Sequence, residues 1–392
     1  MFYSVKPFNI LITCALALPF STEYAYGQGS SNTQTDGSGS NNILTAVPFL
    51  RITPDARSGA MGDAGVAVSP DANSFSINPA KMAFMLEPGG LAISYSPWLK
   101  QIIPDVNLGY ISGYLHLDDR NTIGGSLRYF SLGQIQLTDA NQQDLGTYNP
   151  NEFALDATFA RNFGEGFSLG TTLRYIHSDL SSGQFLAGQD IRPGTAFAMD
   201  LSAYYKENVV MFSKEAIFSA GINISNIGTK LSYVDGGQKQ YLPANLKIGT
   251  ASTFILDDYN TFTVAFDLNK LLVPTQPIYN LDGSIRKGRD PERSLPSSIF
   301  GSFSDAPGGF SEELTEVSIA AGLEYWYNQQ FALRAGYFYE HPDKGDRRYL
   351  TLGAGIKYNV FNIDVSYLAG NIQKSPLAGV MRFSLLFNFG YQ

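Results

Sequence analysis

The sequence is poor in cysteine, in charge and in long apolar runs. After residue 20, no apolar run approaches the roughly 18 residues that a transmembrane helix needs, which excludes a helical membrane protein. Cys14 is the only cysteine, so an internal disulfide is excluded. Charged residues make up only 16% of the 392 residues, and the net charge of −8 argues against nucleic acid as a partner. Glycine, phenylalanine and tyrosine are abundant instead, with 39, 27 and 23 residues.

Residues 1–27 have the pattern of a secretory signal peptide. Lys6 supplies the positively charged n-region, and Phe8–Phe20 form the apolar stretch. Ala25–Gly27 form a small-x-small cleavage site. Cys14 lies inside the apolar stretch, so the exported chain is expected to have no thiol and no cysteine catalysis. Export without cysteine, together with many tyrosines, indicates the outer membrane of a Gram-negative cell.

Three parts are expected after the signal peptide. Residues 28–42 are low in complexity and predict a flexible leader. Residues 43–89, called the N-terminal insert below, are rich in glycine, proline and alanine and have no room for long elements. Residues 90–392 alternate apolar and polar side chains in short segments.

This alternation recurs in fourteen segments. In the last segment, for example, Phe383, Leu385 and Phe387 share one face, while Arg382 and Ser384 lie on the other. A period of two predicts β-strands, and the segments approach the roughly 9–11 residues of a tilted strand that crosses a bilayer. The predicted strands centre on Leu91–Tyr95, Asn107–Leu117, Thr122–Ser131, Phe153–Arg161, Phe167–Ile176, Phe197–Tyr205, Phe218–Ser225, Leu246–Thr253, Phe262–Leu268, Ser318–Tyr327, Phe331–Glu340, Tyr349–Tyr358, Asn362–Leu368 and Met381–Tyr391.

The connections between these segments alternate in length. Residues 162–166 and 359–360 are short, residues 132–150 and 269–315 are long, and residues 206–214 are intermediate. Outer-membrane barrels have an even number of strands, short periplasmic turns and long extracellular loops. A soluble β-sandwich would also alternate, but it would not explain tyrosines at the ends of the apolar faces, where an aromatic girdle belongs. The predicted fold is all-β, a 14-stranded antiparallel transmembrane β-barrel.

The polar faces of the predicted strands carry charged residues. Unpaired buried charge costs several kcal/mol, so these residues are expected to pair across the lumen or with the N-terminal insert, although a water-filled pore would also tolerate them. They are Arg128, Asp156, Arg174, Asp200, Asp267, Glu324, Arg334, Lys357, Asp364 and Arg382.

The N-terminal insert has glycines at every third position, at Gly59, Gly62 and Gly65. They lack the strand–turn–helix context of a dinucleotide motif and predict close backbone packing. With Asn78-Pro79-Ala80 ahead of a fourteen-stranded barrel, the insert resembles that of the FadL-type fatty-acid transporters. This resemblance implies a hatch that plugs the lumen, with the motif residues Gly62, Asp63, Gly65, Asn78, Pro79 and Ala80.

Further stretches carry a more specific resemblance. Phe49–Arg57, Gly62–Ala67, Pro70–Asn73 and Ser225–Lys230 are similar to the PorV family, also called LptO, the outer-membrane shuttle proteins of the type IX secretion system. The resemblance covers nearly all of the chain after the signal peptide. It implies a non-enzymatic carrier that receives cargo, through the cargo's C-terminal signal domain, from the translocon barrel. The carrier then presents the cargo to the sortase-like PorU in an attachment complex, where lipopolysaccharide is attached.

The longest connection, residues 269–315, is the candidate partner-binding loop. Prolines limit its freedom, while its aromatic and basic side chains could anchor a partner or bind phosphate and carboxylate groups of lipopolysaccharide or cargo. Solvated loop charge is the alternative, because acidic residues are interleaved. The candidate residues are Tyr279, Arg286, Lys287, Arg289, Arg293, Phe300, Phe303 and Phe310.

Motifs for catalysis are weak. Gly166–Gly170 matches G-x-S-x-G, but Ser168 lies on the polar face of a predicted strand rather than on a strand-to-helix elbow. His116, His177 and His341 are far apart and have no second ligand at metal spacing. We therefore expect no enzyme, no cofactor and no metal. A FadL-like transporter of hydrophobic small molecules and a deacylase acting on lipid A remain as alternatives.

Overall fold

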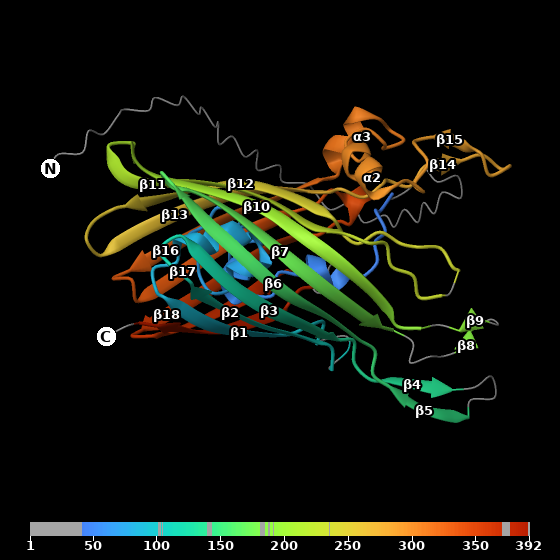
Figure 1. The fold of residues 1–392 in the computed structure, drawn as a ribbon, viewed down its shortest axis with the longest axis horizontal. Coiled ribbons are helices and arrows are strands. Elements are labelled where there is room, and N and C mark those ends of the chain that lie inside the picture. The colour runs from blue at the N-terminus through green and yellow to red at the C-terminus, as the bar shows by residue number, and fades with distance from the viewer. Residues whose placement is uncertain are drawn as a thin grey trace, which may run out of the picture.

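The computed structural model describes residues 41–100, 103, 105–138, 143–180, 185–186, 189–190, 192–234, 236–370 and 377–390. Within these residues, fourteen strands form one closed barrel (Figure 1). The predicted signal peptide and nearly all of the predicted leader lie outside the described residues. The barrel strands are β1 (Gly89–Pro97), β2 (Asn107–His116), β3 (Asn121–Ser131), β6 (Asn151–Gly164), β7 (Phe167–Asp179), β10 (Gly194–Met211), β11 (Lys214–Gly228), β12 (Asn245–Ile255), β13 (Asn260–Leu271), β16 (Val317–Tyr327), β17 (Phe331–Tyr339), β18 (Arg348–Tyr358), β19 (Phe361–Ala369) and β20 (Met381–Phe389).

Each barrel strand pairs antiparallel with its neighbour along the chain, and β1 closes the ring by pairing with β20. The predicted fold class is confirmed, and every predicted strand is present. The prediction of a connection of intermediate length at residues 206–214 was wrong. β10 and β11 extend across these residues and leave only Phe212 and Ser213 between them. The last strand ends at Phe389, before the predicted Tyr391.

The two faces of the barrel wall differ in polarity, as the alternation predicts. On β16 and β17, Leu323 and Leu333 are exposed on the outside, whereas Glu324 and Arg334 are buried in the lumen. Apolar side chains on the outer face and polar side chains inside are the pattern of a barrel that crosses a membrane. Among the described residues, no helix has both the length and the apolar composition needed to cross a membrane.

Long and short connections lie at opposite ends of the barrel. Figure 1 shows small hairpins and short helices at the long-loop end. The hairpins are β4 (Ile135–Thr138) with β5 (Asp144–Tyr148), β8 (Phe185–Leu186) with β9 (Gln189–Asp190), and β14 (Ile278–Tyr279) with β15 (Ile285–Lys287). The helices are α2 (Leu295–Gly301) and α3 (Phe310–Thr315). Residues 272–316, called the long loop below, contain both helices and the last hairpin. The last strand, β20, ends at the opposite end of the barrel.

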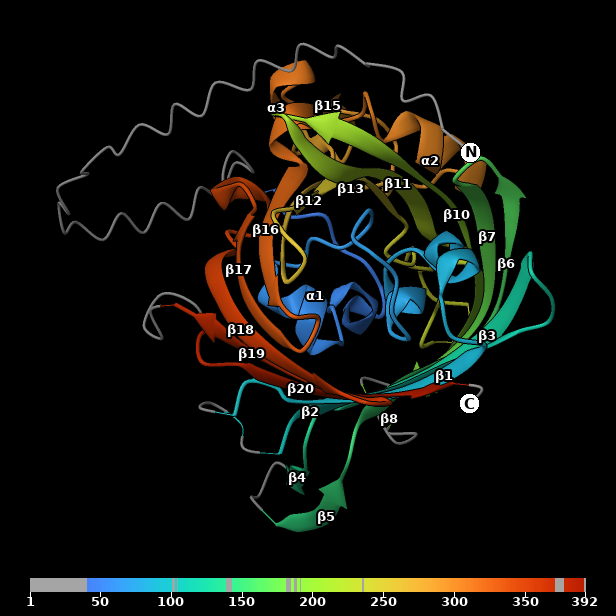
Figure 2. The same ribbon diagram turned by 90° about the vertical axis from the view of Figure 1, so that its left-hand side faces the viewer.

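The N-terminal insert lies inside the ring of strands (Figure 2). It consists of four short helices, η1 (Pro48–Arg51), α1 (Ala56–Ala60), η2 (Ser74–Ser76) and η3 (Pro79–Phe84). Its apolar side chains, such as Phe49, Met61 and Phe75, are almost fully buried. Phe49 stacks on Phe130 of β3, with ring centroids 6.3 Å apart. The insert therefore supplies much of the apolar core that the polar lumen wall lacks.

Candidate functional site

A carboxylate of the barrel wall joins the insert to the lumen. Glu324 on β16 accepts hydrogen bonds from Arg57 of α1 at 2.7 and 2.8 Å, in a bidentate pair. It also accepts from Arg334 on β17 at 2.7 Å, and Arg334 donates to Asp364 on β19 at 2.6 Å. Arg57 reaches Asp71 of the insert as well, at 3.0 Å. Paired, hydrogen-bonded charges of this kind are tolerated in the interior, where an unpaired charge would be costly.

A second set of lumen charges lies on the opposite wall. Arg174 on β7 pairs with Asp156 at 2.7 Å and with Asp200 at 3.1 Å. Arg128 on β3 donates instead to backbone carbonyl groups of the insert, at 2.9 Å to Leu50 and 3.2 Å to Ile52. Arg128, Asp156, Arg174 and Asp200 were all predicted for the polar face, and these four residues pair with each other or bind the insert.

The glycine-rich turn of the insert packs directly on the barrel wall. The Gly62 amide donates to the Thr351 hydroxyl at 2.9 Å, and its φ of +68° is a conformation that favours glycine. The Asp63 carboxylate accepts from the Tyr349 hydroxyl at 2.6 Å and lies 3.7 Å from the Arg382 guanidinium. The backbone amide of Gly65 donates to Asp267 at 2.7 Å. The wall strands thus bind each of these three motif residues.

Asn78, Pro79 and Ala80 anchor the second half of the insert. The Asn78 side chain caps η3 by accepting from the Ala80 amide at 3.1 Å, and it donates to the Val66 carbonyl at 2.8 Å. Pro79 occupies the first turn of η3, where its missing N–H costs nothing. Ala80 also donates to the Ser202 hydroxyl at 3.0 Å.

Ser168 on β7 also binds this part of the insert. Its hydroxyl donates to the Ala80 carbonyl at 2.7 Å. The serine of the G-x-S-x-G match thus holds the insert, which gives a structural reason for its place on the polar face of β7.

Lys81 lies deep inside the barrel. Its ammonium group donates to the Gly65 carbonyl at 2.8 Å, so it ties η3 to the glycine-rich turn. Burial lowers the pKa of Lys81 to about 8. Its position links the two parts of the motif within the insert itself.

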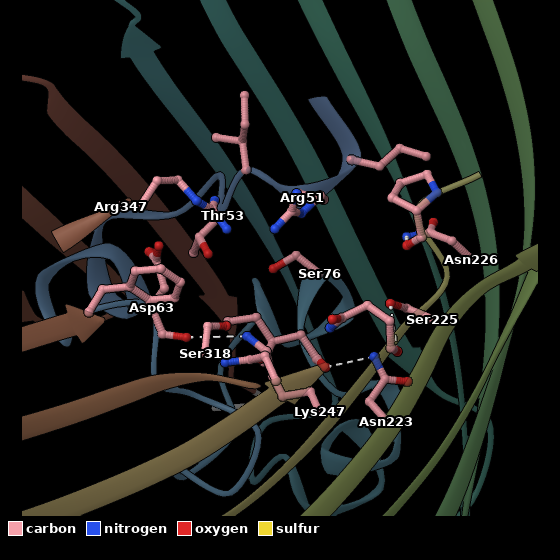
Figure 3. A pocket seen from close by; sticks show the side chains of 17 residues that line it. Arg51, Thr53, Asp63, Ser76, Asn223, Ser225, Asn226, Lys247, Ser318 and Arg347 are labelled. Carbon is pink, nitrogen blue, oxygen red and sulfur yellow. Dashed lines mark hydrogen bonds between the residues drawn. The ribbon is translucent and has the colours of Figure 1, made fainter. Parts of the chain in front are cut away.

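A polar cavity of about 90 Å³ lies between the insert and the wall formed by β11, β12, β13 and β16 (Figure 3). Figure 3 shows Arg51, Asp63, Lys247 and Arg347 around it. Lys247 donates to the Asp63 carbonyl at 3.2 Å. The groups around this cavity are mostly polar or charged, which suits water or a small polar solute better than an apolar molecule.

The base of the long loop is held by a buried ion cluster. Lys270 at the end of β13 pairs with Glu313 at 2.9 Å and with Glu316 at 2.6 Å. Lys344, in η4 (Pro342–Lys344), pairs with Glu312 at 2.5 Å and with Glu316 at 3.0 Å. Two lysines from separate parts of the rim therefore clamp α3 in place.

A neighbouring ion pair holds the connection between β17 and β18. Glu340 accepts from Arg347 at 2.7 Å and from Arg51 of the insert at 3.2 Å. Burial acts to raise the pKa of Glu340, but the hydrogen bond and charge of Arg347 outweigh it, so the pKa lies below its usual value. Burial also acts to raise the pKa of Glu312, and the hydrogen bond from Lys344 is the largest of the effects that lower it overall.

The predicted partner-binding residues of the long loop fall into two groups. Arg293 pairs with Asp305, and its backbone carbonyl accepts from the Tyr241 hydroxyl at 2.6 Å, so it holds the loop together. The other candidates are at least partly solvent-exposed: Tyr279, Arg286, Lys287, Arg289, Phe300, Phe303 and Phe310. Residues 278–301, called the tip of the loop below, therefore offer both basic and aromatic side chains to the surroundings.

A cleft of about 790 Å³ opens beside this tip, between the long loop and the connection from β11 to β12. Tyr279 and Glu292 line it on one side, and Lys230 and Tyr241 on the other. The Lys230 ammonium lies 4.0 Å from the centre of the Tyr241 ring, a cation–π contact that fixes this wall. The cleft is large enough for a peptide segment or several side chains of a partner.

The sequence analysis did not predict the roles of some residues of the site. The clamp made by Lys270 and Lys344 with the three glutamates of the long loop carries no motif. The pairing of Glu324 with Arg334 could have been found, because a hairpin with a three-residue turn places these two side chains opposite each other. Arg57 gave no such signal, because it is 267 positions away from Glu324 in the chain.

Comparison with known proteins gives one family match. A family model described as "Type IX secretion system protein PorV" matches residues 34–278, more than half of the chain. Comparison with curated proteins finds no match.

Solved structures share the fold. The toluene transporter TodX of P. putida has a TM-score of 0.52 at 13% identity, covering 86% of this chain and 99% of that chain. A TodX deltaS2S3 mutant, described as a monoaromatic hydrocarbon channel, has a TM-score of 0.50 at 13% identity, with the same coverage of both chains. At this identity the likeness shows the fold alone.

Proposed function

This chain belongs to the PorV family of type IX secretion system proteins and forms an outer-membrane barrel, and from that premise we propose that it is a docking shuttle. In this proposal it binds a secreted cargo protein through the cargo's C-terminal signal domain after translocation. It then presents the cargo to the sortase-like attachment complex for anchoring on the cell surface. The chain itself supplies binding surfaces and no catalytic step.

The observation that carries the proposal is the construction of the long loop. Its base is immobilised by Lys270 and Lys344, while its tip presents Tyr279, Arg286 and Phe300 to the surroundings. Binding residues on a loop that a rigid scaffold positions lose little conformational freedom when a partner binds. The cleft beside the tip adds a concave surface where a side chain or a strand of the signal domain could enter.

The N-terminal insert supports a role that does not use the lumen. We propose that it acts as a permanent hatch, with Gly62, Asp63, Gly65, Asn78, Pro79 and Ala80 as its fixed points. A transporter for hydrophobic molecules would need an apolar path past the insert. The cavity between the insert and the wall is lined largely by polar groups such as Arg51, Asn223 and Lys247, which disfavours that alternative.

The proposal is tested by removing the basic tip alone. A variant with Arg286→Ser, Lys287→Ser and Arg289→Ser keeps the clamp at the base of the loop. In a pull-down from outer membranes, we expect this variant to recover much less cargo and sortase-like partner than the wild type, while it still migrates as a heat-modifiable barrel. The matched control removes three exposed cations elsewhere, with Lys100→Ser, Arg120→Ser and Lys214→Ser. Equal recovery of partners by both variants would show that the docking surface lies outside the basic tip.

A further inference from the structure

A second recess lies on the outside of the barrel, beneath the long loop. It has a volume of about 230 Å³ and separates α3 from the outer face of β12, β13 and β16. Figure 2 shows α3 outside the ring of strands, next to β16. The barrel contributes Leu246, Ile248, Leu268 and Val317, and the loop contributes Phe303, Phe310 and Leu314.

The lining is suited to an apolar ligand. Asn269, Lys270 and Glu313 also border the recess, and each is less than 10% exposed. Lys270 and Glu313 are paired with each other at 2.9 Å. Their charges are thus already neutralised by a partner. By contrast, Phe310 and Leu314 are 76% and 58% exposed, which leaves a large apolar surface uncovered. Among the described residues that line the recess, apolar side chains form nearly all of the accessible surface.

The recess is continuous with the surface that faces lipid. On β13, Val264, Phe266 and Leu268 point outward in sequence along the strand, and Ile248 lies beside them on β12. Leu246 on β12 and Leu268 on β13 are therefore the last apolar members of the membrane-facing rows at the long-loop end, and together with Ile248 they form the floor of the recess. An acyl chain that already lies against these rows reaches the recess without leaving an apolar environment.

We propose that this recess holds one acyl chain of a lipid of the outer leaflet. The long loop would then rest on the membrane through a bound lipid as well as through its ion clamp. The bound chain would cover Phe310 and Leu314, and it would fix the height of the docking tip above the bilayer. This inference is independent of the docking proposal, because it rests on the outer wall and on no partner protein.

The test uses the full chain in phosphatidylcholine vesicles that contain a phosphatidylcholine with a nitroxide on its acyl chain. We expect an immobilised component in the electron paramagnetic resonance spectrum, and Ile248→Trp should reduce it by filling the recess. The matched control is Ile111→Trp on β2, which faces outward with similar exposure but lies far from the loop. A component that Ile248→Trp leaves unchanged would overturn the proposal.

A second measurement separates lipid from other occupants. In a Cys14→Ser background, a spin label at Leu314→Cys should collide more with oxygen than with a water-soluble nickel complex, whereas a label at Phe300→Cys, outside the recess, should do the reverse. A label at Leu314 that favours the nickel complex would overturn the proposal. So would efficient crosslinking of Leu314→Cys between two copies of the chain, because a second copy would then occupy the recess.

Discussion

The N-terminal insert and the long loop are both additions to a plain barrel, and both carry arginine, lysine and aromatic side chains. In the insert, side chains and backbone groups bond to the lumen wall at many points: Arg57 donates to Glu324, and the Ala80 carbonyl accepts from Ser168. In the long loop, ion pairs hold the base and the interior, while Tyr279 and Phe300 stay exposed. The comparison indicates that the insert contributes mainly to stability, whereas in the proposed function the exposed tip of the loop contributes to binding.

The largest effect is expected at the carboxylate that joins insert and wall. Glu324→Gln removes the negative charge shared by Arg57 and Arg334 and leaves two buried guanidinium groups short of a counter-charge. Breaking a buried charge pair costs about 3–5 kcal/mol. We therefore expect unfolding at a lower denaturant concentration than in the wild type. The loss of heat-modifiable migration measures the midpoint of this unfolding.

The control for this variant is Glu215→Gln, an exposed glutamate at the short-turn end of β11. It should leave the midpoint unchanged. If Glu324→Gln were as stable as this control, the insert would not depend on the wall for its position.

A smaller loss of stability is expected at Gly170, a glycine of the barrel wall that the insert approaches closely. A Cβ atom at Gly170 would lie 2.5 Å from the Ala80 nitrogen, so Gly170→Ala should push η3 away from β7. Such overpacking costs about 1–3 kcal/mol. The same denaturant titration measures it, with Gly109→Ala as control, because the nearest atom there is 4.0 Å away. A stable Gly170→Ala variant would mean that η3 can shift without loss.

The barrel could be predicted from the sequence because its signal is local. Each strand alternates within about ten residues, so even a short segment such as Leu91–Tyr95 gave its position. The exception was the turn between β10 and β11. Phe212 and Ser213 both have positive φ, at 51° and 62°, a geometry that usually calls for asparagine or glycine. Neither residue is present at the turn, and the apolar run Val209–Phe212 continues into it, so the sequence had no signal for a tight turn there.

The site could be predicted only in part because its contacts are not local. Alternation placed Glu324 and Asp267 on the polar face, but it could not show that Arg57 and the Gly65 amide lie opposite them. Composition identified Arg293 as one of several basic residues of the loop, yet only the fold brings Asp305 next to it. Which charges are paired and which are free depends on the path of the loop between the strands.

Acid should loosen the base of the long loop and the neighbouring connection between β17 and β18 before it affects the rest of the barrel. The pKa values of Glu312 and Glu340 are lowered below the reference value of 4.5. Their contribution to stability is therefore complete above that value and is lost as pH falls through their folded pKa values. Limited digestion with pepsin should show faster cleavage of the long loop as pH decreases, with the barrel core intact.

The variant Lys344→Met is the control for the acid effect. It removes the lysine that pairs with Glu312 and one of the two lysines that pair with Glu316, so the loop should be cleaved faster already at the mildest acid pH used. A loop in the wild type that stays equally protected at every pH would contradict the clamp.

The smallest effect is expected at an exposed aromatic residue of the long loop, and it sharpens the contrast with the insert. Phe300 is 79% exposed, so Phe300→Ala removes little buried surface and should change the free energy of unfolding by no more than about 0.5 kcal/mol. Phe49 of the insert is 1% exposed and stacks on Phe130, so the same change there should cost about 3–5 kcal/mol. The same denaturant titration measures both values. Partner recovery in the pull-down should show the reverse order: Phe300→Ala should recover less partner, and the folded fraction of Phe49→Ala should recover as much as the wild type. Equal losses of stability in the two variants would mean that the long loop packs as firmly as the insert, and the division of roles between them would fail.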